Sequence, residues 1–267
     1  MTEDLRLPEM TDLPPDFRNR LSRYTWKCDS LGKSSARVFM LIDDKRPHLF
    51  LKREDAGPFA ALPGEAERLK WLAASGMPCP RVVAQERYEG ANWLLLDALP
   101  GSDLASATFL PNSLRVEILA SALRMLHEMD PTTCPFDETL DASLALAKRR
   151  MNSRLVDETD FDEERRGKSA AELWPYLETE QPAITDLVVT HGDASLPNFM
   201  ADHGRFNGFI DCGRLGLADR YQDISRAIHS IRFNLGTAWV QPFFDLYGLS
   251  QPDTAKIQYY DVLEEFF

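Results

Sequence analysis

One segment of the sequence combines acid and amide side chains at a fixed spacing. It runs from His191 to Asn198 with Asp193 between them, and an apolar-Asp-x-Gly pattern follows at Asp211. Phosphoryl transfer needs a group that orients a nucleophile and accepts its proton, and oxygen ligands that hold metal ions against the phosphate. We therefore predict Asp193 as the catalytic residue, and Asn198 and Asp211 as ligands of Mg2+. Each fragment alone could be a polar turn or a solvated acid, but the combination favours this chemistry.

A lysine and a glutamate precede this segment in the order that such chemistry requires. Lys52 ends a β-prone run and would bind the α- and β-phosphates of a nucleotide, while Glu65, at the start of a predicted helix, would pair with it. Either one alone is more often a surface charge, and Glu67 is a rival to Glu65 for the pairing. The two together, ahead of the catalytic segment, favour a nucleotide site.

Further nucleotide contacts are predicted from position along the chain. The small-residue loop before the first hairpin is neither GxGxxG nor GxxxxGK[ST], but its backbone N–H groups could still bind phosphate. An aromatic residue on the lysine strand could lie over a base or belong to the core, and the segment that leaves the first region could contact the base through its backbone. The residues concerned are Gly32, Ser34 and Ser35 in the loop, Phe50 on the strand, Asp97 and Leu99 in the connecting segment, and Ile210 before the second acid.

The periodicity of apolar residues predicts the elements that must position these side chains. β-prone runs at 37–42 and 48–52 form a hairpin, a helix follows from residue 63 to Gly76, and short strands are expected at 81–84 and 92–97. After Pro100 and Gly101, helices are expected at 114–126, 141–153, 169–178, 221–234 and 254–265, with short strands at 187–190 and 208–210. We predict an α+β fold of two lobes. Residues 1–98 form a small β-sheet lobe with one main helix that binds the nucleotide, and residues 99–267 form a larger, mostly helical lobe.

Composition narrows the class of protein. The formal net charge of −12 disfavours nucleic acid as a partner and suits a cationic ligand, although excess acid also serves simply to keep a protein in solution. No apolar run is long enough to span a membrane, and the first residues lack the pattern of a secretory signal. The cysteines form no CxxC pair and have no spacing suited to zinc, which indicates reduced thiols. We therefore expect a cytoplasmic protein.

Together these motifs resemble those of the aminoglycoside O-phosphotransferases, especially the 3'-phosphotransferases that inactivate kanamycin- and neomycin-type antibiotics. The resemblance covers most of the chain and includes segments 50–52, 93–96, 134–136, 155–157 and 208–223 and the acidic, diaromatic segment 263–267. It implies a protein-kinase-like fold, ATP or GTP as donor, Mg2+, and direct attack by the 3'-hydroxyl of a small cationic aminoglycoside. Such a reaction would confer antibiotic resistance.

The resemblance also implies an acidic pocket, since a substrate with several ammonium groups binds carboxylates through charge-assisted hydrogen bonds. Acidic runs usually form solvated faces, so this assignment rests on the resemblance. Close relatives often present an Arg-Asp pair and a later acid on the helix after Asp223, where this chain has His229, Ser230 and Phe233, and this departure leaves the antibiotic range open. The residues assigned to the pocket are Asp162, Glu163, Arg214, Asp261, Glu264, Glu265 and Phe267.

Two other functions stay open from the sequence. The acceptor could be another amino-alcohol or a macrolide, because the catalytic segment does not name its substrate. The chain could also be a catalytically silent nucleotide-binding protein on the same fold, although Lys52, Asp193, Asn198 and Asp211 are all intact.

Overall fold

The computed structural model describes residues 7–29, 36–184 and 186–267. The chain divides into two compact units, each described here by itself. Unit 1 comprises Met1–Pro100 and Asn207–Gly213, and unit 2 comprises Gly101–Phe206 and Arg214–Phe267.

The short segment Asn207–Gly213 differs from the expected two-lobe division, which assigned every residue from 99 onward to the second lobe. In the structure it belongs to unit 1. The N–H of Phe209 donates to the carbonyl of Pro78 at 3.0 Å, and Gly208 lies so close to Leu99 and Pro78 that a Cβ there would meet Leu99 Cδ1 at 2.6 Å. These tertiary contacts join residues more than a hundred positions apart. A domain boundary placed from the amino-acid composition along the sequence does not reveal them.

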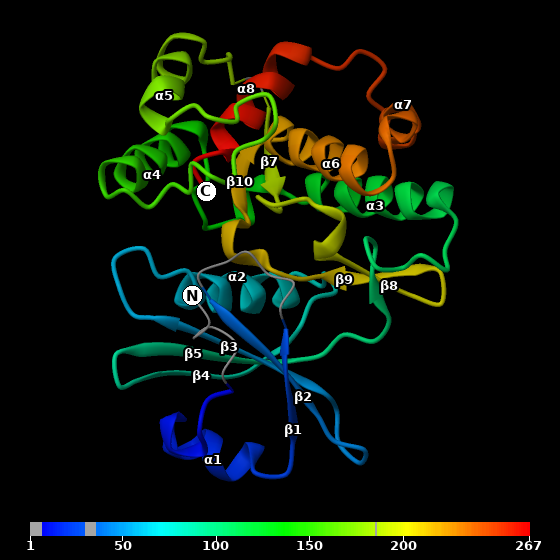
Figure 1. Cartoon of the computed structure of the whole chain (residues 1–267). Helices are drawn as coiled ribbons and strands as arrows, with labels where there is room; N and C mark the ends of the chain where they lie inside the picture. The colour runs from blue at the N-terminus through cyan, green and yellow to red at the C-terminus, as the bar shows by residue number, and fades with distance from the viewer. Residues whose placement is uncertain (1–6, 30–35, 185) are drawn as a thin grey trace. The chain divides into compact units, whose positions relative to one another are not determined.

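Unit 1 is built on one antiparallel sheet in the order β1-β2-β3-β5-β4 (Figure 1). The predicted hairpin is confirmed as β2 and β3, which pair from Arg37↔Arg53 to Leu41↔Leu49. The edge strand β4 alternates half-buried and exposed residues, whereas β5 is buried at almost every position, as expected for an inner strand. The strand bounds are β1 Thr25–Asp29, β2 Arg37–Ile42, β3 Leu49–Asp55, β4 Val82–Tyr88 and β5 Ala91–Asp97.

Two helices pack on this sheet. The short helix α1 (Pro15–Leu21) inserts Phe17 and Leu21 into a cluster with Phe39 and Leu51, and its seven residues are too few for a periodic pattern to predict it. The predicted main helix is α2 (Leu62–Ala74), which buries one apolar face of Leu62, Ala66, Leu69 and Leu72 at helical spacing.

Unit 2 is mostly helical, as predicted. Helix α6 packs against α8, and α3 packs against α7 (Figure 1). The α-helices are α3 Asn112–His127, α4 Leu140–Asn152, α5 Ala170–Thr179, α6 Tyr221–Asn234, α7 Val240–Tyr247 and α8 Thr254–Glu264, and short 3-10 turns lie at Met10–Asp12 in unit 1 and at Pro131–Thr133, Leu196–Asn198 and Thr237–Trp239 in unit 2.

Short strands frame the polar loops between these helices. Strand β7 (Leu187–Thr190) pairs with β10 (Gly216–Asp219), and β6 (Ser102–Asp103) pairs with β8 (Phe199–Asp202). Strand β9 (Arg205–Phe209) carries the chain from unit 2 into unit 1, and the turn Cys212–Arg214 returns it. The catalytic segment therefore follows β7 directly, as the sequence predicted.

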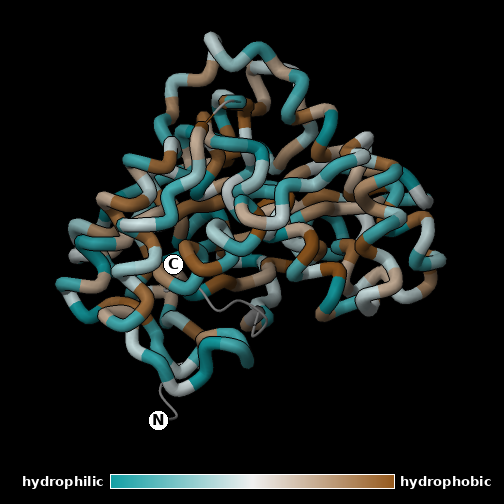
Figure 2. The backbone as a smooth tube through the Cα atoms, turned by 90° about the horizontal axis from the view of Figure 1, so that it is seen from above, coloured by the Kyte–Doolittle hydropathy of each residue, from teal (hydrophilic) through white to brown (hydrophobic). Residues whose placement is uncertain are grey.

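Hydrophobic and hydrophilic residues alternate along the backbone in short stretches, as the brown and teal segments of Figure 2 show. Among the residues that the structure describes, no helix is both long and apolar enough to cross a membrane.

Candidate functional site

Unit 1 brings three of the predicted residues together around the ammonium group of Lys52. Lys52 Nζ lies 2.7 Å from Glu65 Oε1 and also contacts Asp211 Oδ1. The rival Glu67 pairs with Lys70 instead, at 2.8 Å. Burial opposes the charge on Lys52, but the two facing carboxylates outweigh it and raise the pKa of the amine above its usual value. Lys52 is therefore a fixed positive charge.

Local structure explains why these groups meet. Lys52 lies on β3, and Glu65 lies in the first turn of α2. The buried Glu54 carboxylate accepts the N–H groups of Ala61 at 2.9 Å and Leu62 at 2.7 Å, so it binds the start of α2 beside β3. Sequence analysis missed Glu54, although an acid two residues after the lysine on the same strand was a visible signal.

Asp211 is held in an uncommon backbone conformation. Its φ of +57° lies in the left-handed region, which non-glycine residues adopt with strain. Its side chain remains 55% exposed although one carboxylate oxygen faces Lys52. An exposed carboxylate oxygen of this kind suits Mg2+, which prefers hard oxygen ligands.

The other predicted nucleotide contacts fall partly within the described residues. Phe50 lies two positions from Lys52 on β3 and so shares its face of the sheet. The N–H of Asp97 already donates to the carbonyl of Arg81, so any base contact by Asp97 would use its carbonyl. Ile210 is half-buried next to Asp211, Leu99 packs at Gly208, and Gly32, Ser34 and Ser35 lie outside the described residues.

Unit 2 brings Asp193 and Asn198 together. Asn198 Nδ2 donates to Asp193 Oδ2 at 2.8 Å and to the Asp193 carbonyl at 2.9 Å. With its amino group committed in this way, the amide oxygen of Asn198 is left to accept or to bind a cation. The donor set therefore fits the predicted metal ligand.

The other oxygen of Asp193 is bound by a residue that the sequence did not predict. Arg226 Nε on α6 donates to Asp193 Oδ1 at 2.8 Å. Burial alone would raise the pKa of Asp193, but the charge and hydrogen bond of Arg226, with smaller contributions from His191 and Arg214, lower it to about 2. Asp193 is therefore an ionised carboxylate at neutral pH.

A buried acid shapes the catalytic segment. The Asp223 carboxylate accepts the N–H of His191 at 2.6 Å and of Gly192 at 2.8 Å, and it also bonds His127 Nε2 at 3.0 Å. Gly192 has φ +83°, and a Cβ there would lie 2.2 Å from the carbonyl oxygen of Arg214, so only glycine fits. Asp223 and Gly192 thus fix the turn that presents Asp193.

Two further contacts complete this support. His191 Nδ1 accepts the N–H of Asp193 at 3.3 Å, so the imidazole supports the backbone of the catalytic residue. Ser230 Oγ accepts the N–H of Leu196 at 2.9 Å. Ser230, one of the departures from the family pattern, is therefore buried behind the catalytic segment.

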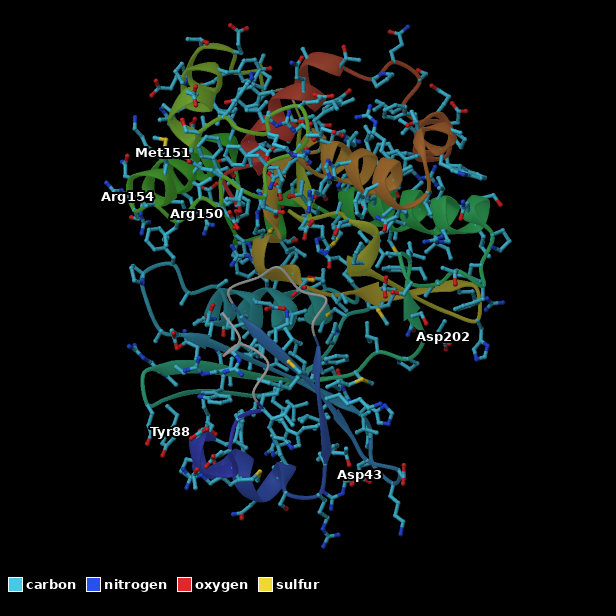
Figure 3. The ribbon with its side chains drawn as sticks, viewed as in Figure 1. Asp43, Tyr88, Arg150, Met151, Arg154 and Asp202 are labelled. Atoms are coloured by element: carbon cyan, nitrogen blue, oxygen red, sulfur yellow. The ribbon has the colours of Figure 1, made fainter. Side chains whose placement is uncertain are left out.

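Part of the predicted acidic pocket gathers at the end of α8. Arg214 Nη1 donates to both oxygens of Glu264, at 2.8 and 2.9 Å, and its guanidinium lies 4.1 Å over the ring of Phe267. Arg150, labelled on α4 in Figure 3, donates to the carbonyls of Phe266 and Phe267 at 2.7 and 3.0 Å. These contacts fix the position of the last residues.

Arg165 gathers the remaining carboxylates. Arg165 Nη2 lies 2.8 Å from Asp162 Oδ2 and 2.9 Å from Asp261 Oδ2, and Arg165 Nε donates to Glu265. His229 on α6 adds an imidazole 3.3 Å from Asp162, and the hydrogen bond to Asp162 raises the pKa of His229. Asp162, Asp261 and Glu265 therefore do meet, but each one already has a cationic partner within this unit.

Asp162, His229 and Asp261 could in principle hold a metal ion, because one ligand atom from each lies within 4.8 Å of the others. The Arg165 guanidinium bonds both carboxylates, however, and its charge opposes a second cation there. These three residues fit an internal ion-pair network better than a metal site.

Glu163 stands apart from the other pocket residues. Its side chain is 89% exposed, with Arg166 at 4.0 Å. Sequence reasoning also missed Arg165, Arg226 and Asp223. Arg226 contacts a residue 33 positions away, and Arg165 contacts Asp261, 96 positions away, as well as the nearby Asp162, so these long-range contacts left no local signal.

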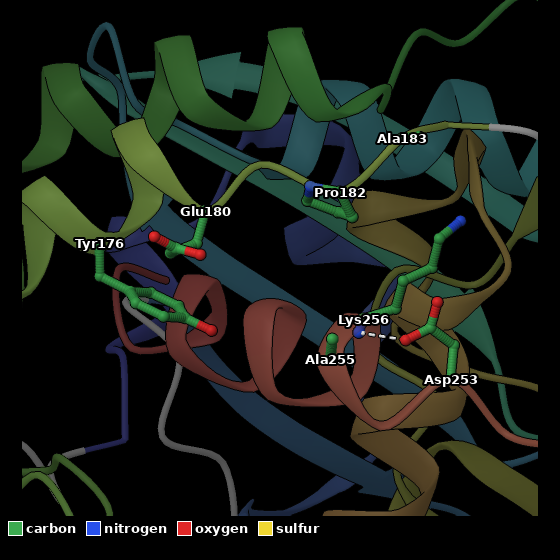
Figure 4. Close-up of a pocket in the computed structure, with 7 residues that line it drawn as sticks. All are labelled: Tyr176, Glu180, Pro182, Ala183, Asp253, Ala255 and Lys256. Atoms are coloured by element: carbon green, nitrogen blue, oxygen red, sulfur yellow. Dashed lines mark hydrogen bonds between the residues drawn. The ribbon is translucent and has the colours of Figure 1, made fainter.

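Unit 2 also has a surface depression away from these residues (Figure 4). It is lined by Tyr176, Glu180 and Lys256 among others, and it includes none of the predicted site residues. Lys256 Nζ is committed to the buried Asp219 carboxylate. The positive charge of Lys256 is therefore not available to a ligand there.

Comparisons with known proteins show which proteins this chain is similar to. An aminoglycoside 3'-phosphotransferase from Streptomyces fradiae is 37% identical to this chain, over 94% of this chain and 98% of its own length. One from Escherichia coli is also 37% identical, over 91% of this chain and 91% of its own length. The crystal structure of an aminoglycoside 3'-phosphotransferase of type VIII superposes with a TM-score of 0.87 at 34% identity, covering 97% of this chain and 99% of that one. A Streptomyces rimosus aminoglycoside phosphotransferase in complex with ADP and streptomycin superposes with a TM-score of 0.79 at 28% identity, covering 94% and 95%.

These similarities confirm the predicted α+β, protein-kinase-like fold. A family model described as the phosphotransferase enzyme family matches residues 30–265. The chain therefore belongs to this family and is a phosphotransferase.

Proposed function

We propose that this enzyme transfers the γ-phosphate of ATP or GTP to the 3'-hydroxyl of an aminoglycoside such as kanamycin or neomycin, and so confers resistance in the cytoplasm. Its similarity to aminoglycoside 3'-phosphotransferases over almost the whole chain supports the acceptor. The structural observation that carries the proposal is the ionised Asp193, with one oxygen bonded by Asn198 and the other by Arg226.

Unit 1 supplies the residues for the donor. Lys52 is a fixed cation for the α- and β-phosphates, and its ion pair with Glu65 holds the ammonium in place. Asp211 of this unit carries an oxygen that would hold Mg2+, and Asn198 of unit 2 is the other proposed ligand; the ion would neutralise charge on the phosphates. Phe50, on the same face of β3 as Lys52, is the aromatic residue proposed to lie against the base.

Unit 2 supplies the residue for the acceptor hydroxyl. Asp193 accepts a hydrogen bond from the hydroxyl and orients its oxygen toward the γ-phosphorus. As the new O–P bond forms, the bond from phosphorus to the leaving nucleoside diphosphate breaks, and the hydroxyl proton passes to Asp193 and then to solvent. A carboxylate with a pKa of about 2 is a weak base, so its larger contribution is orientation, with proton transfer late.

Acceptor specificity provides the first test. Nucleotide consumption is measured with kanamycin A, with tobramycin, which lacks the 3'-hydroxyl, and with choline and erythromycin. We expect turnover with kanamycin A alone. Turnover with choline or erythromycin but not kanamycin would reject the aminoglycoside assignment, and equal turnover with tobramycin would reject the 3'-position.

Asp193→Asn is the matched test of the catalytic residue. We expect kcat to fall about 100-fold or more, the usual scale for a lost general base, while nucleotide affinity stays close to that of the native enzyme. Asp141→Asn, an exposed acid in the first turn of α4, is the control and retains activity. Full activity of Asp193→Asn contradicts the assigned role.

A further inference from the structure

The face of α6 that meets the predicted acceptor residues is cationic. Arg226 bonds Asp193 at 2.8 Å and lies 3.7 Å from Glu264 Oε1. His229, one turn further along the helix, lies 3.3 Å from Asp162 and 3.9 Å from Asp261. Residues three apart share a helix face, so α6 presents a guanidinium and an imidazole in succession to the carboxylates of unit 2.

Arg226 is close enough to the reaction to affect the acceptor directly. A reacting hydroxyl must lie within hydrogen-bond distance of Asp193, about 3 Å. Because Asn198 bonds one carboxylate oxygen and Arg226 the other, a hydroxyl bound to either oxygen lies beside one of these two side chains. A substituent on the carbon next to the reacting one then comes within about 4–7 Å of the guanidinium, where like charges repel measurably.

The environment of Arg226 preserves that repulsion. Its side chain is only 30% exposed, so solvent screens it less than a surface arginine. Glu264 also receives two hydrogen bonds from Arg214, so it neutralises Arg226 only in part. A neutral hydroxyl at the neighbouring carbon can instead accept a hydrogen bond from the guanidinium.

We propose, on the basis of the function proposed above, that Arg226 makes this enzyme select acceptors with a hydroxyl rather than an ammonium group on the carbon beside the reacting 3'-carbon. Arg226 would act both as a specificity-determining residue and as a positioning residue for Asp193. The two roles have separate readouts.

Kanamycin A and kanamycin B form a matched pair for the test, since they differ only in a 2'-hydroxyl or 2'-amino group. The ratio of their kcat/KM values is measured at a pH where the 2'-amine is protonated. We expect the native enzyme to prefer kanamycin A about tenfold, as a partly neutralised like charge at this distance implies. Arg226→Gln should bring the ratio to near one, and Arg226→Lys should retain the preference.

Controls separate specificity from general damage. Misplacement of Asp193 in a variant lowers turnover of both antibiotics alike, so it cancels from the ratio. Arg232→Gln removes the same charge from an exposed position of α6 and should leave the ratio unchanged. For the positioning role, Arg226→Gln should lower kcat for kanamycin A, and Arg226→Lys should restore most of it, because a lysine ammonium can again bind the Asp193 carboxylate.

The outcomes distinguish the two proposals. Absence of turnover with both kanamycins refutes the proposed function. Turnover with an A-to-B ratio that is the same in the native enzyme and Arg226→Gln refutes only the selectivity proposal. Equal kcat values for kanamycin A in the native enzyme and Arg226→Gln refute the positioning role of Arg226.

Discussion

Lys52 shows how one side chain can serve both stability and ligand binding. It is buried beside Glu65 and also contacts Asp211, so its charge is needed by the folded protein before any nucleotide arrives. Removing one partner of a buried ion pair leaves the other charge desolvated and unpaired, which costs more than the pair itself contributes. The loss of activity in a simple lysine variant is therefore ambiguous unless stability is measured beside it.

For Lys52→Met we expect the free energy of unfolding to fall by about 3 kcal/mol and the KM for ATP to rise about tenfold or more. Urea denaturation and initial-rate kinetics measure the two effects. The double variant Lys52→Met/Glu65→Leu removes the unpaired carboxylate and should regain most of the stability but none of the nucleotide affinity. Recovery of both in the double variant would show that Lys52 acts only through folding.

At the scale of elements, the segment that connects β7 to the 3-10 turn Leu196–Asn198 is tightly constrained by its neighbours. Asp223 on α6 binds its backbone, and Gly192 passes against the carbonyl of Arg214. The position of Asp193 thus depends on backbone packing as well as on its own side-chain contacts.

Two glycines offer a matched comparison of this constraint. Both Gly192 and Gly204 have left-handed φ, +83° and +73°, but an added Cβ meets a carbonyl oxygen at 2.2 Å in the first and only a leucine methyl at 3.6 Å in the second. Gly204→Ala should cost about 1 kcal/mol from backbone strain alone. Gly192→Ala should lower the melting temperature much further and reduce kcat, and equal losses in thermal melts would contradict the steric argument.

Sequence spacing predicted the elements and residues that are set by local pattern. The acid and amide of the catalytic segment, the Lys52–Glu65 pair and the main helices follow from motifs and periodicity. The contacts of Arg165 with Asp261 and of Arg226 with Asp193 could not be predicted in this way, because these residues become neighbours only through tertiary packing. The acids assigned to the pocket are expected from the resemblance to face a cationic substrate, whereas in the structure Asp162, Asp261, Glu264 and Glu265 each bond an arginine.

At the scale of the whole molecule, the net charge of −12 acts beyond any single contact. A negative protein attracts a polycationic acceptor over distances of about the Debye length, near 10 Å at 0.1 M salt, and repels a nucleoside triphosphate. The two substrates should therefore respond to ionic strength with opposite signs.

We expect the KM for kanamycin A to rise several-fold between about 0.05 and 0.5 M KCl, because salt screens the attraction. The KM for ATP should stay constant or fall over the same range. Initial rates at fixed saturating co-substrate test this, and thermal melts at each salt concentration control for changes in stability. A parallel rise in both KM values would contradict an electrostatic origin.

The two sides of helix α6 should tolerate mutation differently as the enzyme evolves. Its buried side carries Asp223 and Ser230, which hold the catalytic segment, while its other side carries Arg226, His229 and Phe233, whose side chain is 84% exposed. Mutations on the buried side are expected to be removed by selection, because they disturb the turn that presents Asp193. Mutations on the other side are expected to change which acceptors bind, with little loss of folding stability. Antibiotic selection can therefore broaden or narrow the resistance spectrum through substitutions on this one side of α6.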